Sequence, residues 1–212
     1  MKKILSGIFM FYFMLSLLLA QSNDSLPAFP GAQGYGMYST KGGRLGQVIH
    51  VRNLNTEGPG SFLAACQTPG PRIVVFDTSG VIIRESGFEI THPYITIAGQ
   101  TAPGAGITLQ GFLYTNYNTP NSGYNIIIRF LRIRACSCPS QSDVIAINNG
   151  AHDVFLDHLS LAWTGDETVD ITNCNNATVQ WCTIEEGPTP HNYGLYSGYP
   201  GGGRFSVHHN LF

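Results

Sequence analysis

A short apolar stretch recurs four times in the second half of the sequence: Ile126-Ile-Ile-Arg-Phe-Leu-Arg-Ile133, Val154-Phe-Leu-Asp-His-Leu-Ser-Leu161, Thr178-Val-Gln-Trp-Cys-Thr-Ile184 and Ser206-Val-His-His-Asn-Leu-Phe212. The copies align on Arg129, Asp157, Gln180 and His208, whose numbers differ by 28, 23 and 28 in turn. An earlier stretch, Tyr94-Ile-Thr-Ile97, fits one step further back. Each copy leads through a turn-rich stretch into a second apolar run, such as Val144-Ile-Ala-Ile147. Repeats of about 20 to 50 residues are typical of solenoids, in which each unit buries its apolar face only against its neighbours.

The strands between the turns are short and no helical period separates them, which predicts an all-β fold, a β-solenoid. A β-sandwich would show hairpin turns at shorter intervals and no stacking register. A βαβ fold would need amphipathic helices, which the sequence lacks. The glycines of Gly31–Gly36 and of Gly42-Gly43 neither follow a strand nor open a helix, so we interpret them as turns and not as a nucleotide-binding loop.

The N-terminal segment 1–20 resembles a secretion signal. Lys2 and Lys3 form a basic start, residues 4–19 are almost entirely apolar, and Ala20 is a small residue suited to cleavage. The apolar run is shorter than the roughly 20 residues of a transmembrane span. We therefore expect residues 1–20 to be a signal peptide, residues 21–212 to form one domain, and the product to be secreted. An uncleaved N-terminal anchor is the alternative.

Acidic residues cluster in the second half of the chain. Of the 13 acidic residues, eight lie between Asp143 and Glu186, and no lysine or arginine lies between Arg134 and Arg204. Such a segment repels polyanions unless a cation intervenes, so we expect no nucleic-acid partner. The remaining interpretations are a solvated acidic face and a metal site built from oxygen ligands.

Three of these carboxylates form the candidate metal site. Asp166 and Asp170 occupy positions i and i+4, and side chains at that spacing in a strand lie on the same face. Asp143 precedes the run Val144–Ile147, and Val144 lies one coil before Thr168. Stacked coils lie about 4.8 Å apart, so Asp143, Asp166 and Asp170 can surround one point. Hard oxygen ligands without nearby basic residues favour Ca²⁺ over Mg²⁺.

The five cysteines permit disulfides but leave one residue over. Cys136 and Cys138 do not have the spacing of a zinc site. Cys174 and Cys182 could pair if their turns meet, while Cys182 in its apolar strand is interpreted as core. The sequence does not decide how Cys66 and the other four are paired.

Five stretches resemble the pectate lyases of polysaccharide lyase family 1: Ala28-Phe-Pro-Gly-Ala-Gln-Gly-Tyr-Gly36, Tyr94-Ile-Thr-Ile-Ala-Gly-Gln-Thr-Ala-Pro-Gly104, Asn125-Ile-Ile-Ile-Arg-Phe-Leu-Arg-Ile-Arg134, Phe155-Leu-Asp-His158 and His208-His-Asn-Leu211. They follow in order over nearly all of residues 28–212. The resemblance implies a right-handed parallel β-helix that uses Ca²⁺ and cleaves polygalacturonate, an acidic plant cell-wall polysaccharide, by β-elimination. We also expect a monomer with no membrane partner.

The resemblance also implies roles for single residues. Asp143 matches the family's upstream calcium aspartate, and Asp166 and Asp170 match its downstream acidic pair. The Asp157-His158 pair is interpreted as structural, and His208 and His209 as residues that stack between coils.

Two departures from the family matter for catalysis. Many members place a substrate-binding lysine near the stretch His191-Asn-Tyr-Gly194, where this chain has none and Tyr193 is the nearest occupant. The family's catalytic arginine follows the His-His-Asn-Leu-Phe strand, so we expect it beyond Phe212, and the catalytic residue stays unknown. We therefore expect the chain to be the N-terminal part of a lyase, with a β-helix incomplete at its C-terminus, and to be inactive alone.

Three rival functions remain open at this point. A polygalacturonase would hydrolyse the same polymer with carboxylates as acid and base. A lyase for methylated pectin needs no calcium, and the carboxylate triad argues against it. A non-catalytic β-helix that binds pectate or a surface partner is the alternative from another class.

Overall fold

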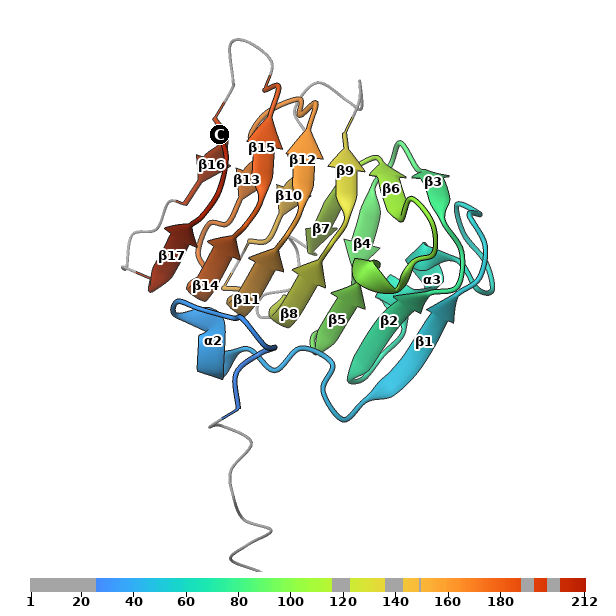
Figure 1. Cartoon of the computed structure of the whole chain (residues 1–212), viewed down its shortest axis with the longest axis horizontal. Coiled ribbons are helices and arrows are strands. Elements are labelled where there is room, and N and C mark those ends of the chain that lie inside the picture. The colour runs from blue at the N-terminus through green and yellow to red at the C-terminus, as the bar shows by residue number, and fades with distance from the viewer. Residues whose placement is uncertain (1–25, 116–122, 136–142, 149, 188–192, 198–202) are drawn as a thin grey trace, which may run out of the picture.

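The computed structural model describes residues 26–115, 123–135, 143–148, 150–187, 193–197 and 203–212. The chain winds into a right-handed parallel β-helix, in which successive coils add strands to three parallel sheets (Figure 1). The predicted fold class is confirmed. The predicted signal peptide, Cys136 and Cys138 lie outside the described residues.

The three sheets are named A, B and C in the order in which a coil visits them. Sheet A has seven strands: β1 (Gln47–Val51), β2 (Arg72–Phe76), β5 (Ile95–Ala98), β8 (Tyr124–Arg129), β11 (His152–Asp157), β14 (Asn175–Gln180) and β17 (Phe205–His208). Sheet B has five: β3 (Gly80–Ile83), β6 (Ile107–Gln110), β9 (Arg132–Arg134), β12 (Ser160–Ala162) and β15 (Thr183–Glu185). Sheet C also has five: β4 (Phe88–Ile90), β7 (Leu113–Thr115), β10 (Ile145–Ala146), β13 (Val169–Asp170) and β16 (Leu195–Tyr196).

The stacking register agrees with the repeat in the sequence. Arg129, Asp157, Gln180 and His208 are partners across β8, β11, β14 and β17. One residue earlier, the column Ile128, Leu156 and Val179 is fully buried, whereas Val207 on the last strand is 42% exposed. The steps of the sequence repeat are therefore coils of the β-helix, as predicted.

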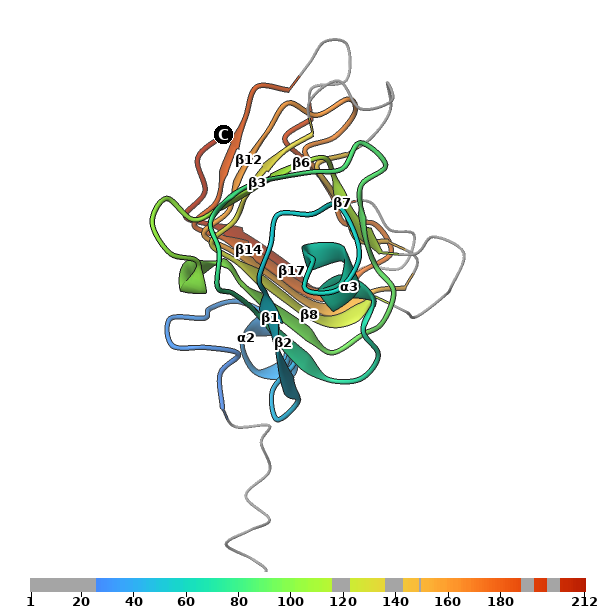
Figure 2. The same ribbon diagram turned by 90° about the vertical axis from the view of Figure 1, so that its right-hand side faces the viewer.

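A short helix closes the N-terminal end of the core. Helix α3 (Phe62–Gln67) lies within the ring of the first coils when the β-helix is viewed end-on (Figure 2). Its residue Phe62 packs against Phe76 and Phe88, with ring centroids 5.8 and 5.3 Å away. These contacts cover the apolar interior of the first coil.

The fully buried Arg72 ties this helix to the coils beneath it. Its guanidinium donates hydrogen bonds of 2.6–3.1 Å to five backbone carbonyls, which belong to Ala65, Cys66, Gly70, His92 and Pro93. Burial lowers the pKa of Arg72 to about 10, so the side chain remains a cation at neutral pH. A single side chain thus satisfies the carbonyls that the end of the helix and two turns leave unpaired.

The segment 28–44 lies along the outer face of sheet A and contains helix α2 (Gly36–Ser39) (Figure 2). Its backbone N–H groups donate to side chains of the sheet, from Tyr35 to Ser206 at 3.1 Å and from Gly43 to Thr96 at 3.0 Å. Gly43 has no room for a Cβ, which would lie 1.7 Å from the carbonyl oxygen of Arg72. The glycines at 42–43 therefore lie in turns, as interpreted, and serve close backbone packing. Gly36 begins the short helix α2, so the expectation that Gly31–Gly36 open no helix was wrong.

Replacing Thr178 with valine tests how strongly this segment is held. The buried Thr178 hydroxyl accepts a hydrogen bond from the Gly36 N–H at 3.0 Å. Valine has nearly the same shape but leaves the buried N–H without a partner, which costs about 1–3 kcal/mol. We expect the free energy of unfolding in urea to fall by that amount. Thr183→Val is the control, because the half-buried Thr183 hydroxyl has no hydrogen-bond partner within the described residues. An equal loss of stability in both variants would contradict the role of Thr178 in holding segment 28–44.

Asp157 is a structural residue, in agreement with its interpretation from the sequence. It is fully buried and accepts hydrogen bonds of 2.7 Å from Arg129 and Gln180, one coil to each side. Gln180 also donates to the Gly31 carbonyl, and the Arg129 guanidinium lies 3.7 Å from the ring centroid of Phe29. The buried carboxylate is therefore compensated by its neighbours and fixes segment 28–44 to the sheet.

An aromatic stack runs along the turn from sheet A to sheet B. Phe130, His158, Trp181 and His209 all have φ between 53° and 57° and occupy this turn in successive coils. The Phe130 and His158 rings are 4.5 Å apart and those of Trp181 and His209 are 4.3 Å apart, both stacked. His209 is thus a coil-stacking residue, as predicted.

Cys66, Cys174 and Cys182 are buried and unpaired. The bond considered between Cys174 and Cys182 is therefore absent, and Cys182 fills the core. None of the described helices is both long and apolar enough to cross a bilayer.

Candidate metal-binding site

The predicted site residues lie where the chain passes from sheet B to sheet C. Asp143 precedes β10, Asp166 lies in the loop between β12 and β13, and Asp170 ends β13. Ile145 pairs with Val169, so the two coils have the offset that the sequence predicted. The same register sets Asp143 beside Glu167, whose backbone N–H donates to Asp143 Oδ1 at 3.0 Å.

The structure brings Asp143 and Asp166 together, with Glu167 as the third member of the cluster. One carboxylate oxygen from each of these residues lies within 4.8 Å of the other two. Glu167 was not predicted as a ligand. The signal that could have found it is its distance along the chain from Asp143, which equals the length of this coil.

Asp170 is the most deeply buried carboxylate of the group, with 9% of its surface exposed. It lies outside the three-residue cluster, but its charge raises the pKa of Asp143. Its Oδ2 accepts a hydrogen bond from the Asn148 amide at 3.2 Å. Its Oδ1 is buried and has no hydrogen-bond partner within the described residues. A buried oxygen without a donor is costly, and a cation would compensate it.

The pKa values of Asp143 and Asp170 are raised by their surroundings. Burial, followed by the neighbouring Asp170 carboxylate, raises the pKa of Asp143 to about 8. Burial likewise raises the pKa of Asp170, against the hydrogen bond from Asn148. No lysine or arginine of the described chain is among the groups that shift either pKa. A bound cation would favour the charged form of both carboxyl groups and lower their pKa values again.

Asn148 is a supporting residue that the sequence did not reveal. Its amide nitrogen holds Asp170, and its Oδ1 accepts hydrogen bonds from the Thr172 N–H at 3.1 Å and hydroxyl at 2.9 Å. Asn148 is itself buried. Asn148 thus holds the Asp170 carboxylate from the preceding coil and is itself held by Thr172, two residues after Asp170.

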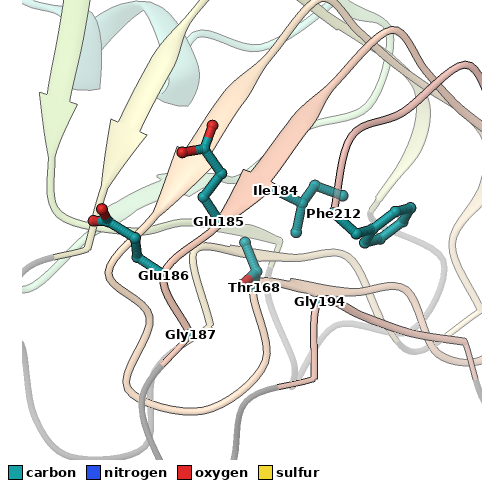
Figure 3. Close-up of a pocket in the computed structure, with 7 residues that line it drawn as sticks. All are labelled: Thr168, Ile184, Glu185, Glu186, Gly187, Gly194 and Phe212. Atoms are coloured by element: carbon teal, nitrogen blue, oxygen red, sulfur yellow. The ribbon is translucent and has the colours of Figure 1, made fainter.

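A pocket of about 330 Å³ is lined by residues that include Thr168, the residue after Glu167 (Figure 3). Its lining consists of Thr168, Ile184, Glu185, Glu186, Gly187, Gly194 and Phe212. Thr168 directly follows Glu167 and donates its N–H to the Tyr193 carbonyl at 3.0 Å. The exposed Tyr193 therefore lies one coil beyond the cluster.

The arrangement fits a hard cation. All the candidate donors are carboxylate oxygens, two adjacent coils supply them, and one is buried without a partner among the described residues. Ca²⁺ takes six to eight such oxygens in flexible geometry, including carboxylates and water. Asp143, Asp166, Glu167 and Asp170 could hold it, with Asn148 as the outer support.

The chain is similar in sequence to fungal proteins named "Probable pectate lyase C". The protein from Aspergillus flavus is 38% identical over 198 residues, which cover 92% of this chain and 45% of that protein. Those from Aspergillus fumigatus and Emericella nidulans are 39% identical over 195 and 202 residues, covering 91% and 94% of this chain. The chain spans somewhat less than half the length of these curated relatives. No family model matches the chain.

A solved structure supports the fold. The crystal structure of Jun a 1, the major allergen from cedar pollen, superposes with a TM-score of 0.58 at 17% identity. The superposition covers 76% of this chain and 53% of the allergen, and shows likeness of fold alone. The resemblance that the sequence motifs indicated is therefore confirmed by the sequence relatives: this chain is a homologue of proteins named pectate lyase over nearly all of its own length.

Proposed function

We propose that the chain forms the calcium- and substrate-binding part of a secreted pectate lyase, which cleaves polygalacturonate by β-elimination. The observation that carries the proposal is the acidic cluster of Asp143, Asp166 and Glu167 beside the unpartnered buried oxygen of Asp170. The names of the sequence relatives support the same activity. We also propose that residues 1–20 direct export, because the substrate is a cell-wall polymer.

Calcium, when bound, supplies a Lewis acid that withdraws charge from a substrate carboxylate and so acidifies the neighbouring C5 proton. The chain's own residues prepare that site. Asp143, Asp166, Glu167 and Asp170 present the oxygens, and Asn148 holds Asp170 in place. An acidic groove attracts an acidic polymer only when a cation offsets its charge, so substrate binding should depend on calcium.

The group that removes the C5 proton is not among the described residues of the cluster. We propose that the whole lyase uses an arginine located beyond Phe212, in the part of the relatives that this chain does not span. A positioned base contributes about 10²–10⁴ in rate. Substrate binding and substrate cleavage are therefore tested in separate experiments.

The test of binding uses this chain and a galacturonate oligomer. We expect calorimetry at pH 8 to detect the oligomer in the presence of Ca²⁺ and not in the presence of EDTA. A neutral glucan oligomer of equal length should not bind in either condition. Binding that is equally strong with EDTA would contradict the calcium site.

The same proposal is tested at the level of turnover. A chain of the full length of the relatives should release an unsaturated uronate, measured by ultraviolet absorbance at alkaline pH, and EDTA should abolish its release. The present chain should give no product above background. A full-length chain that binds the polymer without cleaving it would favour a non-catalytic pectate-binding β-helix, and a saturated product would indicate hydrolysis.

A further inference from the structure

We propose that Trp163 is a stacking platform for one galacturonate ring of the polymer, with Arg134 beside it as the partner of that sugar's carboxylate. This inference rests on the proposed function. It is carried by an exposed indole that three successive coils hold next to the acidic cluster.

Trp163 is held in an unfavourable backbone conformation. It follows β12 and has a φ of 66°, a left-handed value that is costly for a bulky side chain. The next residue, Thr164, forms hydrogen bonds to two residues of the acidic cluster. Its hydroxyl donates to the Glu167 carbonyl and accepts from the Asp166 N–H at 3.2 Å. The backbone after Trp163 is therefore tied to the loop that carries Asp166 and Glu167.

The neighbouring coils orient the indole ring. On one side, the Arg134 guanidinium lies 5.6 Å from its ring centroid. On the other, the indole N–H donates to the carboxylate of Glu186, which also lines the pocket beside Thr168. Although these contacts hold the ring, the side chain stays 49% exposed. An apolar ring face next to an acidic pocket is a surface suited to a sugar.

Trp181 shows what a structural tryptophan looks like in the same fold. It is 47% exposed, almost as much as Trp163. However, its ring lies in the aromatic stack between His158, at 6.1 Å, and His209, at 4.3 Å. Both faces are thereby directed at neighbouring coils. Within the described residues, Trp163 has a single such contact, with Arg134.

The chemistry of the pair fits galacturonate. The face of an aromatic ring is electron-rich and apolar, so it attracts the C–H groups on the flat side of a pyranose. Arg134 is the last basic residue before the acidic segment, and the next lysine or arginine in the sequence is Arg204. It is held by hydrogen bonds to the Ser160 carbonyl at 2.7 Å and hydroxyl at 2.8 Å. A guanidinium fixed in this way can pair with a carboxylate, which distinguishes galacturonate from neutral sugars.

The chain offers an internal control for the experiment, because it contains two tryptophans. Trp181→Phe leaves Trp163 as the only indole, and Trp163→Phe leaves Trp181. We expect trigalacturonate with Ca²⁺ at pH 8 to change the fluorescence of the Trp181→Phe chain, and to leave that of the Trp163→Phe chain unchanged. By calorimetry, Trp163→Ala should weaken the binding on the order of tenfold, and Trp163→Phe should restore most of it.

The outcomes separate the two proposals. One outcome would refute only the role of Trp163. In it, calorimetry shows calcium-dependent binding, the Trp181→Phe chain keeps its fluorescence, and Trp163→Ala keeps its affinity. The proposed function would then remain intact. Binding that is absent from the unmodified chain and from every variant would overturn the proposed function, and the platform with it. Arg134→Gln should weaken binding of trigalacturonate more than binding of its methyl ester, and equal losses would remove Arg134 from the subsite.

Discussion

Replacing Asp143 with asparagine is expected to lower the calcium affinity of the chain by about 100-fold or more. Asp143 shares the cluster with Asp166 and Glu167, and even outer supports of a metal ligand contribute about 10- to 100-fold. Asp166→Asn and Asp170→Asn should each weaken binding as well. Calorimetry with Ca²⁺ measures the effect, and Asp77→Asn is the control, since the exposed Asp77 pairs with His50 away from the site. Equal affinity in the unmodified chain and all three site variants would remove the assignment.

Asp143→Asn should increase the stability of the metal-free chain, although it weakens calcium binding. The pKa of Asp143 is raised from 3.8 to about 8, so between these values the folded state binds more protons than the unfolded state. Stability therefore falls as the pH rises from about 4 to about 8. Asparagine removes this contribution, so Asp143→Asn should unfold at a higher urea concentration than the unmodified chain at pH 8 in EDTA. Protons compete with calcium over the same range, so calcium affinity should rise with pH until about pH 8.

Replacing Arg72 with methionine is expected to cause a large loss of stability. Methionine fills much of the same space but leaves five carbonyls without the donor that now binds them. The bonds to Ala65 and Cys66 are buried and the other three partly buried. Each buried unsatisfied group costs about 1–3 kcal/mol, so we expect a loss of about 4 kcal/mol, against the roughly 5–15 kcal/mol that stabilise a typical domain. Urea unfolding followed by circular dichroism gives the measurement.

Two further variants serve as controls for the loss of stability in Arg72→Met. Arg52→Met removes an exposed arginine whose ion pair with Asp77 spans 3.6 Å, and should change stability by less than about 0.5 kcal/mol. Arg72→Lys keeps the charge but not the planar array of donors, so it should fall between the other two. If Arg72→Met were as stable as Arg52→Met, the carbonyls would have found other donors, and the importance of Arg72 would be disproved.

The coil register could be predicted from the sequence because it has a local signal. Apolar residues must face inward in every coil, so Ile128, Leu156 and Val179 mark the same column wherever the intervening loop ends. The strand pairing between Ile145 and Val169 was predictable for the same reason. Loops of unequal length make some coils longer than others without altering the inward positions.

The composition of the acidic cluster could be predicted only in part. The rule that i and i+4 share a face holds for a strand, but only Val169–Asp170 is strand in this region. Asp166 lies in a bend, which turns Glu167 toward Asp143 and leaves Asp170 in the adjacent buried position. Asn148 gave no signal at all, because its importance lies in hydrogen bonds to Thr172 and Asp170, which belong to the next coil.

The path of segment 28–44 across sheet A gives the protein an unusual order of assembly. A solenoid ordinarily folds by adding each coil to the previous one, with contacts between neighbours in sequence. Here the hydrogen bond from the Tyr35 N–H needs Ser206, which lies 171 residues later in the chain. At about 5–20 residues per second, Ser206 is synthesised roughly 10–30 seconds after Tyr35. Segment 28–44 is therefore among the last parts of the described chain to reach its final position. Its docking makes the stepwise addition of coils depend on a contact between residues far apart in the sequence.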